Sequence, residues 1–167
     1  METNQPKRKR IHLKDYDYSS EGIYFVTISV HNRQNLLSKV VGRGLAPAEV
    51  EYTAYGKEAE RQLLLLEERY PFLRIESYVI MPDHIHMMLA FGEKTAGASP
   101  RPTLYDVVCA YKSLTTRECK RIYPVEKLFQ TSFYEHIIRD QEDYNEKARY
   151  IEENPLRWML KNKDIGW

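Results

Sequence analysis

Two histidines separated by one residue, His84 and His86, are the sharpest chemical feature of this sequence. Successive side chains of a β-strand point to opposite faces, so in a strand these imidazoles share one face and Ile85 lies on the other. Imidazole is a common ligand of divalent metals, and two on one face provide half of a metal site. The competing interpretation is a pair of ordinary half-exposed histidines, and the pair alone does not decide between the two.

A tyrosine and an asparagine four residues apart, Tyr150 and Asn154, form a second candidate near the end of the chain. Residues at this spacing stack on one face of a helix, whereas Tyr144, Ala148 and Ile151 form a neighbouring stripe that we expect to face the core. A phenol can act as a nucleophile, and an amide oxygen is a hard metal ligand. Because the chain has 13 tyrosines, a structural role for Tyr150 is the main alternative.

Two clusters of basic residues could follow a phosphate backbone. One is an N-terminal arm at about residues 1–11, and the other lies in a predicted helix. Their members are Lys7, Arg8, Lys9 and Arg10 in the arm, and Lys112, Arg117, Lys120 and Arg121 in the helix. The net charge of +1 gives no global indication of a nucleic-acid partner, so solvated surface charge is the alternative for both clusters.

The composition is that of one globular domain spanning residues 1–167, with 43% hydrophobic and 29% charged residues. No apolar run approaches the ~20 residues of a membrane helix, and the N-terminus lacks the apolar core of a signal peptide. We therefore expect a cytoplasmic protein. Cys109 and Cys119 lie about 15 Å apart along a predicted helix, too far for a disulfide, and form no CxxC motif.

The elements that must position these residues follow the order β-β-α-β-β-α-β-α. β-branched and aromatic runs predict strands at 23–31, 36–41, 74–80, 84–91 and 133–139. Helical periodicity predicts helices from about 53 to 70, from an N-cap at Thr103 to about 122, and from a cap at Asp140 to Asn154. Pro155 should interrupt or kink the last helix. This order predicts an α+β fold: a mainly antiparallel sheet with helices packed on it, ferredoxin-like or RRM-like, plus a C-terminal helix carrying Tyr150.

Together, MPDHIHMML and the later RYIEENP resemble the HUH single-tyrosine transposases of the smallest insertion sequences, and most closely the REP-associated tyrosine transposases. Three longer stretches are similar to the same family: DYDYSSEGIYFVTISVHNR, YVIMPDHIH and FYEHIIRDQEDYNEKARYIEENP. The resemblance extends from about Ile11 to Pro155, while the tail after Trp158 is less typical.

This resemblance implies a role for each matching residue. His84 and His86 match the metal-binding pair, Asn154 the third protein ligand and Tyr150 the nucleophile. Asp83 and His136 are candidates for supporting the site from just outside it, and for His136 plain packing at a strand edge is an equal alternative.

The same resemblance implies chemistry on single-stranded DNA that contains a hairpin. A divalent ion, Mg²⁺ or Mn²⁺, would polarise the scissile phosphate while Tyr150 attacks, leaving a 5′-phosphotyrosine and a free 3′-hydroxyl that can rejoin strands. The residues leave open what deprotonates Tyr150, with Asp83, His136 and water as candidates. They also leave open a monomer or a homodimer, and which DNA is recognised.

Two other functions remain to be weighed. A zinc hydrolase needs a third histidine or carboxylate ligand and a general base, as in HExxH, and the sequence has no such motif. A catalytically silent module that binds hairpin or single-stranded DNA through basic and aromatic residues is the alternative to an enzyme.

Overall fold

The computed structural model describes residues 21–42, 47–93 and 100–162, so the basic arm with Lys7 to Arg10 lies outside the described residues. A four-stranded antiparallel sheet in the order β4-β5-β1-β6 forms the centre of the molecule. Its strands are β1 (Gly22–Ser29), β4 (Leu73–Ile80), β5 (His84–Phe91) and β6 (Tyr134–Ile137). The predicted antiparallel α+β architecture is confirmed.

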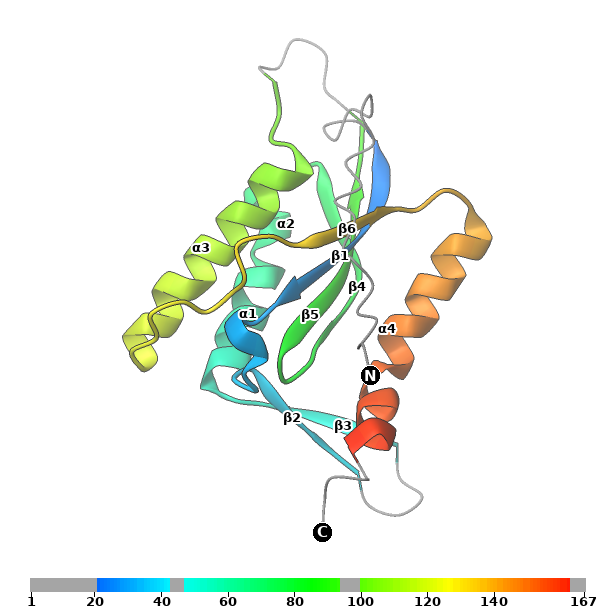
Figure 1. Cartoon of the computed structure of the whole chain (residues 1–167). Helices are drawn as coiled ribbons and strands as arrows, with labels where there is room; N and C mark the ends of the chain where they lie inside the picture. Colours follow the sequence, from blue (N-terminus) through cyan, green and yellow to red (C-terminus); the bar gives the residue numbers. More distant parts are fainter. Residues whose placement is uncertain (1–20, 43–46, 94–99, 163–167) are drawn as a thin grey trace, which may run out of the picture.

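Helices cover both faces of this sheet (Figure 1). On one face lie α1 (Ala54–Leu64), α2 (Leu66–Arg69) and α3 (Leu104–Ile122). On the other face, α4 (Gln141–Asn162) is the one helix among the described residues. Along the described stretches, no helix has the length and apolar character that a membrane span requires.

The alternation of side chains along β5 creates two separate cores. Ile85, Met87 and Leu89 belong to the large apolar cluster beneath α1 and α3. Met88 packs on the opposite face with Phe25 and Ile151 of α4. Because every second residue of β5 faces α4, His84 and His86 must face α4 as well. The strand is buried on both faces, so the two histidines are removed from bulk water.

The structure corrects the expected order of elements in the first half of the chain. A strand that we did not predict, β3 (Glu49–Tyr52), pairs antiparallel with β2 (Ser38–Val41) in a separate two-stranded sheet. The helix expected at 53–70 is divided into α1 and α2 at Leu65. Polar and apolar side chains alternate along the four residues of β3, and their exposure alternates in the same way, so the sequence carried a strand signal that our prediction missed.

Of the two outcomes predicted at Pro155, an interruption or a kink, the interruption and the helix end at Asn154 are wrong, because α4 continues to Asn162 with Pro155 inside it. Proline removes one backbone donor, which would have bonded the carbonyl of residue 151. Packing beyond the proline favours the helix: Trp158 lies 6.2 Å from His84 between ring centroids, and Met159 contacts Gly42 after β2. Tertiary contacts therefore outweigh the lost hydrogen bond.

The predicted helix starts are correct. Thr103 forms a capping box with Asp106 at the start of α3, and Asp140 accepts a 2.8 Å hydrogen bond from the backbone of Asp143 in the first turn of α4. The start of α4 is thus fixed, and with it the helical phase that decides which of its residues face the sheet.

Candidate active site between the sheet and α4

His84 and His86 lie side by side on the face of β5 that α4 covers. Their ring centroids are 4.5 Å apart, and the residues are 8% and 5% exposed. Antiparallel pairing places Ser29 opposite His84 and Thr27 opposite His86 on the neighbouring β1. The prediction that the two imidazoles share a face is therefore confirmed, and the structure shows them buried rather than half-exposed.

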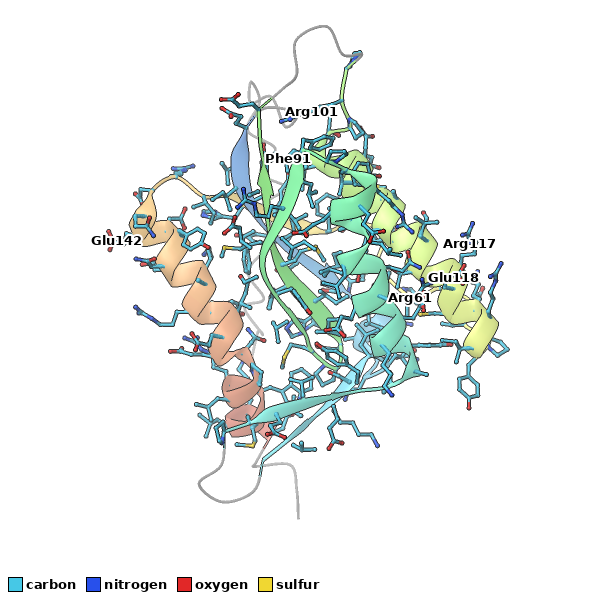
Figure 2. All side chains as sticks on the ribbon, turned by 180° about the vertical axis from the view of Figure 1, so that it is seen from behind. Arg61, Phe91, Arg101, Arg117, Glu118 and Glu142 are labelled. Carbon is cyan, nitrogen blue, oxygen red and sulfur yellow. The ribbon has the colours of Figure 1, made fainter. Side chains whose placement is uncertain are left out.

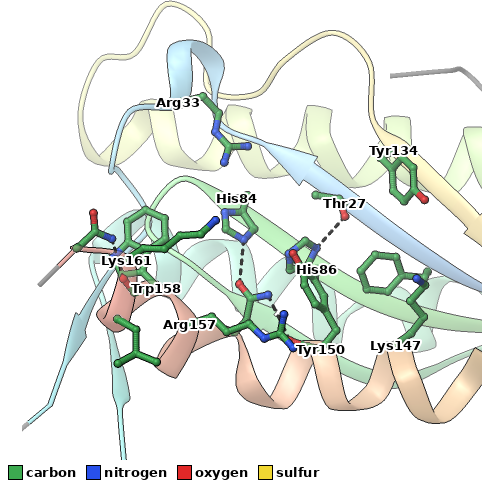
Figure 3. Close-up of a pocket in the computed structure, with 14 residues that line it drawn as sticks. Thr27, Arg33, His84, His86, Tyr134, Lys147, Tyr150, Arg157, Trp158 and Lys161 are labelled. Atoms are coloured by element: carbon green, nitrogen blue, oxygen red, sulfur yellow. Dashed lines mark hydrogen bonds between the residues drawn. The ribbon is translucent and has the colours of Figure 1, made fainter. Parts of the chain in front are cut away.

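Each histidine uses its Nδ1 atom for a fixed partner. His84 Nδ1 lies 2.6 Å from Asp83 Oδ1, and His86 Nδ1 lies 2.8 Å from Thr27 Oγ1. Metal-binding histidines commonly have the second ring nitrogen held in this way, because the partner fixes the orientation of the ring. Both Nε2 atoms are left facing the side of the sheet that α4 covers (Figure 3).

The structure brings Asn154 from α4 to the two histidines. Its Oδ1 lies 3.2 Å from His84 Nε2, and its Nδ2 donates to the Tyr150 carbonyl at 3.3 Å. The Asp83 carboxylate can only accept, so His84 donates from Nδ1; in the tautomer with a single ring proton, Nε2 then presents its lone pair to another acceptor, Asn154 Oδ1. Two acceptors facing each other at this distance favour a cation between them.

His86 supplies the third donor atom. Its Nε2 is buried and has no hydrogen-bond partner among the described residues. A buried polar atom without a partner is rare and costly, and His86 lines the same pocket as His84 and Asn154. Two imidazole nitrogens and one amide oxygen therefore fit a divalent cation that keeps open positions for substrate. Within the described residues, no group of three or more His, Cys, Asp or Glu side chains could hold a metal, so the fit depends on Asn154.

The electrostatics of the site keep His86 neutral and Asp83 ionised. Burial, together with the nearby His84 and Arg33, lowers the pKa of His86 to about 2, so this imidazole stays neutral. Burial alone would raise the pKa of Asp83, but the hydrogen bond and charge of His84, together with Arg33 at 2.9 Å, outweigh it and hold that pKa below its usual value. Asp83 therefore stays ionised beside His84.

Tyr150 lies on the face of α4 that carries Asn154, one turn earlier. It is 37% exposed, and its ring lies 5.1 Å from the His86 ring and 6.1 Å from the Phe25 ring, between centroids. Ile151 is buried, with Tyr144 and Ala148 packed beside it, which confirms the predicted core stripe. The helix therefore buries one stripe and turns the neighbouring one, with Tyr150, toward the histidines.

A pocket of about 880 Å³ joins these residues. Its floor is formed by the histidines and Thr27, and its wall by α4 (Figure 3). Four of its lining residues are cations that our sequence analysis did not select: Arg33, Lys147, Arg157 and Lys161. No carboxylate is among the lining residues of the described chain. The pocket therefore suits a polyanion.

The spacing of three of these cations along the sequence would have predicted that they share a helix face with Tyr150 and Asn154. Lys147, Arg157 and Lys161 fall on the Tyr150–Asn154 face at intervals of three and four residues. Lys147 Nζ lies 5.6 Å from the Phe25 ring, and the guanidinium carbon of Arg157 lies 5.3 Å from the Tyr150 ring. Arg33 and Thr27 had no comparable signal, because Thr27 reaches the site through the register of β1 with β5, and Arg33 through the 3₁₀ turn His31–Arg33 that follows β1.

His136 lies near α4 but not in the pocket. Its Nε2 is 2.7 Å from Asp143 Oδ2, which also accepts a hydrogen bond from the Arg139 backbone. The pair joins β6 to the first turn of α4, so of the two interpretations of His136 the structure favours packing. Neither Asp83, engaged with His84 and Arg33, nor His136 is hydrogen-bonded to the Tyr150 hydroxyl within the described residues.

The basic residues of α3 lie on the opposite face of the sheet from the pocket (Figure 2). Lys112 donates to the carbonyls of Gln130 and Thr131, while Arg117 and Arg121 both pair with Glu118. Lys112, Arg117 and Lys120 line a second, shallower pocket of about 420 Å³. The structure therefore does not bring this predicted cluster to the histidines and Tyr150.

Two histidines on a sheet facing a tyrosine and an asparagine on a helix form an arrangement that can be compared with known proteins. Three relatives match most of the chain. An uncharacterized protein of Haemophilus influenzae is 28% identical over 90% of this chain and 89% of its own length. A second H. influenzae protein, named as a REP-associated tyrosine transposase, is 28% identical over 84% of this chain and 74% of its length. The REP-associated tyrosine transposase of Escherichia coli is 24% identical over 88% and 75%.

A solved structure has the same fold. It is a REP-associated tyrosine transposase bound to a REP hairpin, with a TM-score of 0.63 and 21% identity over 85% of this chain and 71% of that one. No protein-family model matches the chain. The resemblance to REP-associated tyrosine transposases predicted from the motifs is confirmed, and the chain is thus a relative of DNA-processing enzymes.

Proposed function

We propose that this chain is a metal-dependent, transposase-type enzyme that cleaves and rejoins single-stranded DNA, with Tyr150 as the nucleophile. The observation that carries the proposal is the convergence of three donor atoms, His84 Nε2, His86 Nε2 and Asn154 Oδ1, in the pocket that Tyr150 lines. The transposase names of the relatives support the same class of reaction.

His84, His86 and Asn154 would hold the metal, with Asp83 and Thr27 keeping the imidazoles in place. Mg²⁺ or Mn²⁺ is the expected ion, and the two nitrogen ligands favour Mn²⁺. Bound there, the ion would supply Lewis-acid polarisation of the scissile phosphate. The protein contributes rigid ligands, because both rings are buried and hydrogen-bonded before any substrate arrives.

The covalent step forms one bond and breaks one. The Tyr150 oxygen attacks phosphorus, the bond from phosphorus to the 3′-oxygen breaks, and the leaving oxygen takes a proton from solvent to become a 3′-hydroxyl. The phenol proton leaves to water, because no carboxylate is among the described residues that line the pocket. The phosphotyrosine ester keeps the linkage activated, so a 3′-hydroxyl can attack it and release Tyr150 with strands joined.

The walls of the pocket suit single-stranded DNA. Cations on α4 can contact phosphates, and Tyr134 and Trp158 offer aromatic faces for unpaired bases. Tyr134 is 38% exposed on the β6 side of the pocket, so a base could reach it. A relative of the same fold is bound to a REP hairpin, which supports hairpin DNA as the partner.

The test is covalent attachment of the chain to DNA. We expect the protein, incubated with Mn²⁺ and hairpin oligonucleotides copied from repeats beside its gene, to give an adduct that survives a denaturing gel. Chelation of the metal should abolish the adduct. Retention of an oligonucleotide on a native gel with no adduct under any metal condition would instead indicate a catalytically silent hairpin-binding module.

A further inference from the structure

A short turn after β1 holds its backbone in an unusual conformation. Asn32 and Arg33, in the 3₁₀ turn His31–Arg33, have φ angles of 56° and 53°. Two consecutive non-glycine residues in this left-handed region are uncommon, and such strain persists only where the surrounding structure enforces it. Here Val30 donates to the carbonyl of Asp83 at 2.8 Å, and His31 donates to that of Leu128 at 2.8 Å.

The strained turn directs the Arg33 side chain into the catalytic pocket beside His84 (Figure 3). Nε donates to Asp83 Oδ2 at 2.9 Å, and Nη1 donates to Ser29 Oγ at 2.9 Å. The third nitrogen, Nη2, makes no hydrogen bond with the described residues, and 47% of the side chain is exposed. Two donors thus fix the guanidinium in place, and the remaining one is available to a ligand.

Arg33 also differs in position from the other cations of the pocket. Lys147, Arg157 and Lys161 come from α4, whereas Arg33 comes from the end of β1. In the close-up, Arg33 lies across His84 from Arg157 (Figure 3). A phosphate seated at the two Nε2 atoms would therefore meet α4 on one side and Arg33 on the other.

We propose that Arg33 is a catalytic residue whose free Nη2 group donates a hydrogen bond to a non-bridging oxygen of the scissile phosphate. The inference rests on the proposed function. Negative charge grows on that oxygen as Tyr150 attacks, and Arg33 stabilises it without transferring a proton. A guanidinium is permanently charged and gives strong, directional hydrogen bonds to phosphate. Because Asp83 and Ser29 fix the donor beforehand, little reorganisation is needed during the reaction.

An experiment must distinguish direct contact of Arg33 with phosphate from an indirect role through Asp83. The arginine could act only through Asp83, by holding this carboxylate against His84, and so influence the metal rather than the phosphate. In that case its loss should weaken metal binding, since removing the groups that support a metal ligand typically costs 10–100-fold in affinity. Direct contact with phosphate instead predicts slow cleavage at saturating metal.

The experiment compares the wild type with Arg33→Ala, Arg33→Lys and the matched control Arg61→Ala. Arg61 is also paired with a carboxylate, Glu58, but lies on α1 on the other face of the sheet. Two quantities are measured: Mn²⁺ affinity of the protein alone by calorimetry, and the single-turnover rate of adduct formation with a hairpin oligonucleotide from the gene's flanking repeats. Each rate is measured at saturating Mn²⁺, with and without millimolar guanidinium chloride.

We expect Arg33→Ala to slow adduct formation on the order of 100-fold at saturating Mn²⁺, the usual loss when one charge-stabilising donor is removed. Its Mn²⁺ affinity should change far less than 10-fold, and guanidinium ion should restore a large part of the rate. Arg33→Lys keeps a charge beside Asp83 but loses the fork, so it should stay slow. Arg61→Ala should match the wild type throughout.

Two results would overturn the inference. One is a rate for Arg33→Ala that returns fully at saturating Mn²⁺, because Arg33 would then act only through Asp83. The other is a slow Arg33→Ala whose rate guanidinium ion leaves unchanged. If the wild-type chain forms no adduct with any oligonucleotide, the proposed function itself fails, and this inference fails with it.

Discussion

At the scale of single residues, the candidate site depends on which nitrogen of each histidine is occupied. Asp83 and Thr27 take the two Nδ1 atoms, and the Nε2 atoms face Asn154 and the pocket. If the Nε2 atoms were hydrogen-bonded in place of the Nδ1 atoms, the two histidines would have no free nitrogen facing Asn154 to bind a metal. The hydrogen bonds of Asp83 and Thr27 therefore matter as much to the proposed metal site as the histidines themselves.

Replacement of the histidines tests the metal ligands. We expect His84→Ala and His86→Ala each to lose measurable Mn²⁺ binding in calorimetry and metal-dependent cleavage, with the circular dichroism spectrum unchanged. The loss should exceed the 10–100-fold typical of groups that only support a ligand. Cleavage at the wild-type rate by the double variant would show that the histidines hold no essential metal.

Thr27 gives a milder test of the same arrangement. Thr27→Val keeps the shape of the side chain but removes the hydroxyl that holds His86 Nδ1. Mn²⁺ affinity should fall about 10–100-fold, because the ring loses its orienting partner. Thr116→Val on α3 is the matched control, since this hydroxyl bonds only the Lys112 carbonyl within its own helix. Equal metal affinities for the two variants would contradict the role given to Thr27.

At the scale of elements, α4 supplies both Tyr150 and Asn154, so its placement on the sheet decides whether the site forms. The position of its first turn is fixed by Asp143, which joins His136 of β6 and the Arg139 backbone. Beyond Pro155, Trp158 near His84 continues the packing of α4 along the pocket. Two contacts far apart along the helix therefore set its register against the histidines.

The anchor at Asp143 predicts a dependence of stability on pH. Burial would raise the pKa of Asp143, but hydrogen bonds from His136 and the Arg139 backbone outweigh it, so its folded-state pKa lies below the usual value. A group with a depressed pKa stabilises the fold above its unfolded pKa and loses that contribution as pH falls through the folded value.

Asp143→Asn should therefore lower the free energy of unfolding by about 1 kcal/mol at pH 7, the usual net worth of such hydrogen bonds. The difference from the wild type should shrink as pH falls below the usual aspartate pKa of about 3.9 toward the lower folded value, so it should be smaller at pH 3 than at pH 7. Urea unfolding at both pH values measures this. A deficit that is the same at pH 7 and pH 3 would rule out the ionised Asp143 as its source.

The elements also show what could be predicted from sequence and why. The shared face of His84 and His86, and of Tyr150 and Asn154, follows from the fixed periods of strand and helix. Local rules fail where tertiary packing decides: α4 continues through Pro155 because its last turns pack on the sheet. Thr27 was missed because its approach to His86 depends on the register of two strands more than fifty residues apart in sequence, and Arg33 because it reaches the site through a turn with positive φ angles after β1.

At the scale of the whole molecule, charge is distributed unevenly although the net charge is only +1. The described pocket has cations and no carboxylate on its walls, while the α3 cations lie on the far face and are partly paired with Glu118. We therefore expect the pocket side to contribute more to DNA binding than the α3 side.

Salt dependence measures this difference. Affinity for a single-stranded oligonucleotide should fall steeply with salt, with each phosphate contact contributing about 0.7 to the logarithmic slope. Arg157→Ala and Lys161→Ala should each lower the slope by roughly that amount, whereas Arg121→Ala should change it little. If Arg121→Ala reduces the slope as much as the pocket variants do, the α3 face also binds DNA, as the sequence first indicated.

The central claim is that Tyr150 forms the covalent bond to DNA, and one comparison tests it directly. Tyr150→Phe removes a single oxygen from a partly exposed side chain, so the fold, the metal site and hairpin binding should persist. Tyr144→Phe is the matched control, because it removes the same oxygen from a tyrosine of the same helix whose hydroxyl bonds Glu76 instead.

The measurement is mass spectrometry of the peptide that carries the oligonucleotide after incubation with Mn²⁺ and the hairpin DNA. The account predicts that wild type and Tyr144→Phe carry the nucleotide on Tyr150, through its 5′-phosphate, and that Tyr150→Phe carries none while still binding the hairpin. An adduct on Tyr150→Phe, or a wild-type adduct on any other residue, would contradict the account.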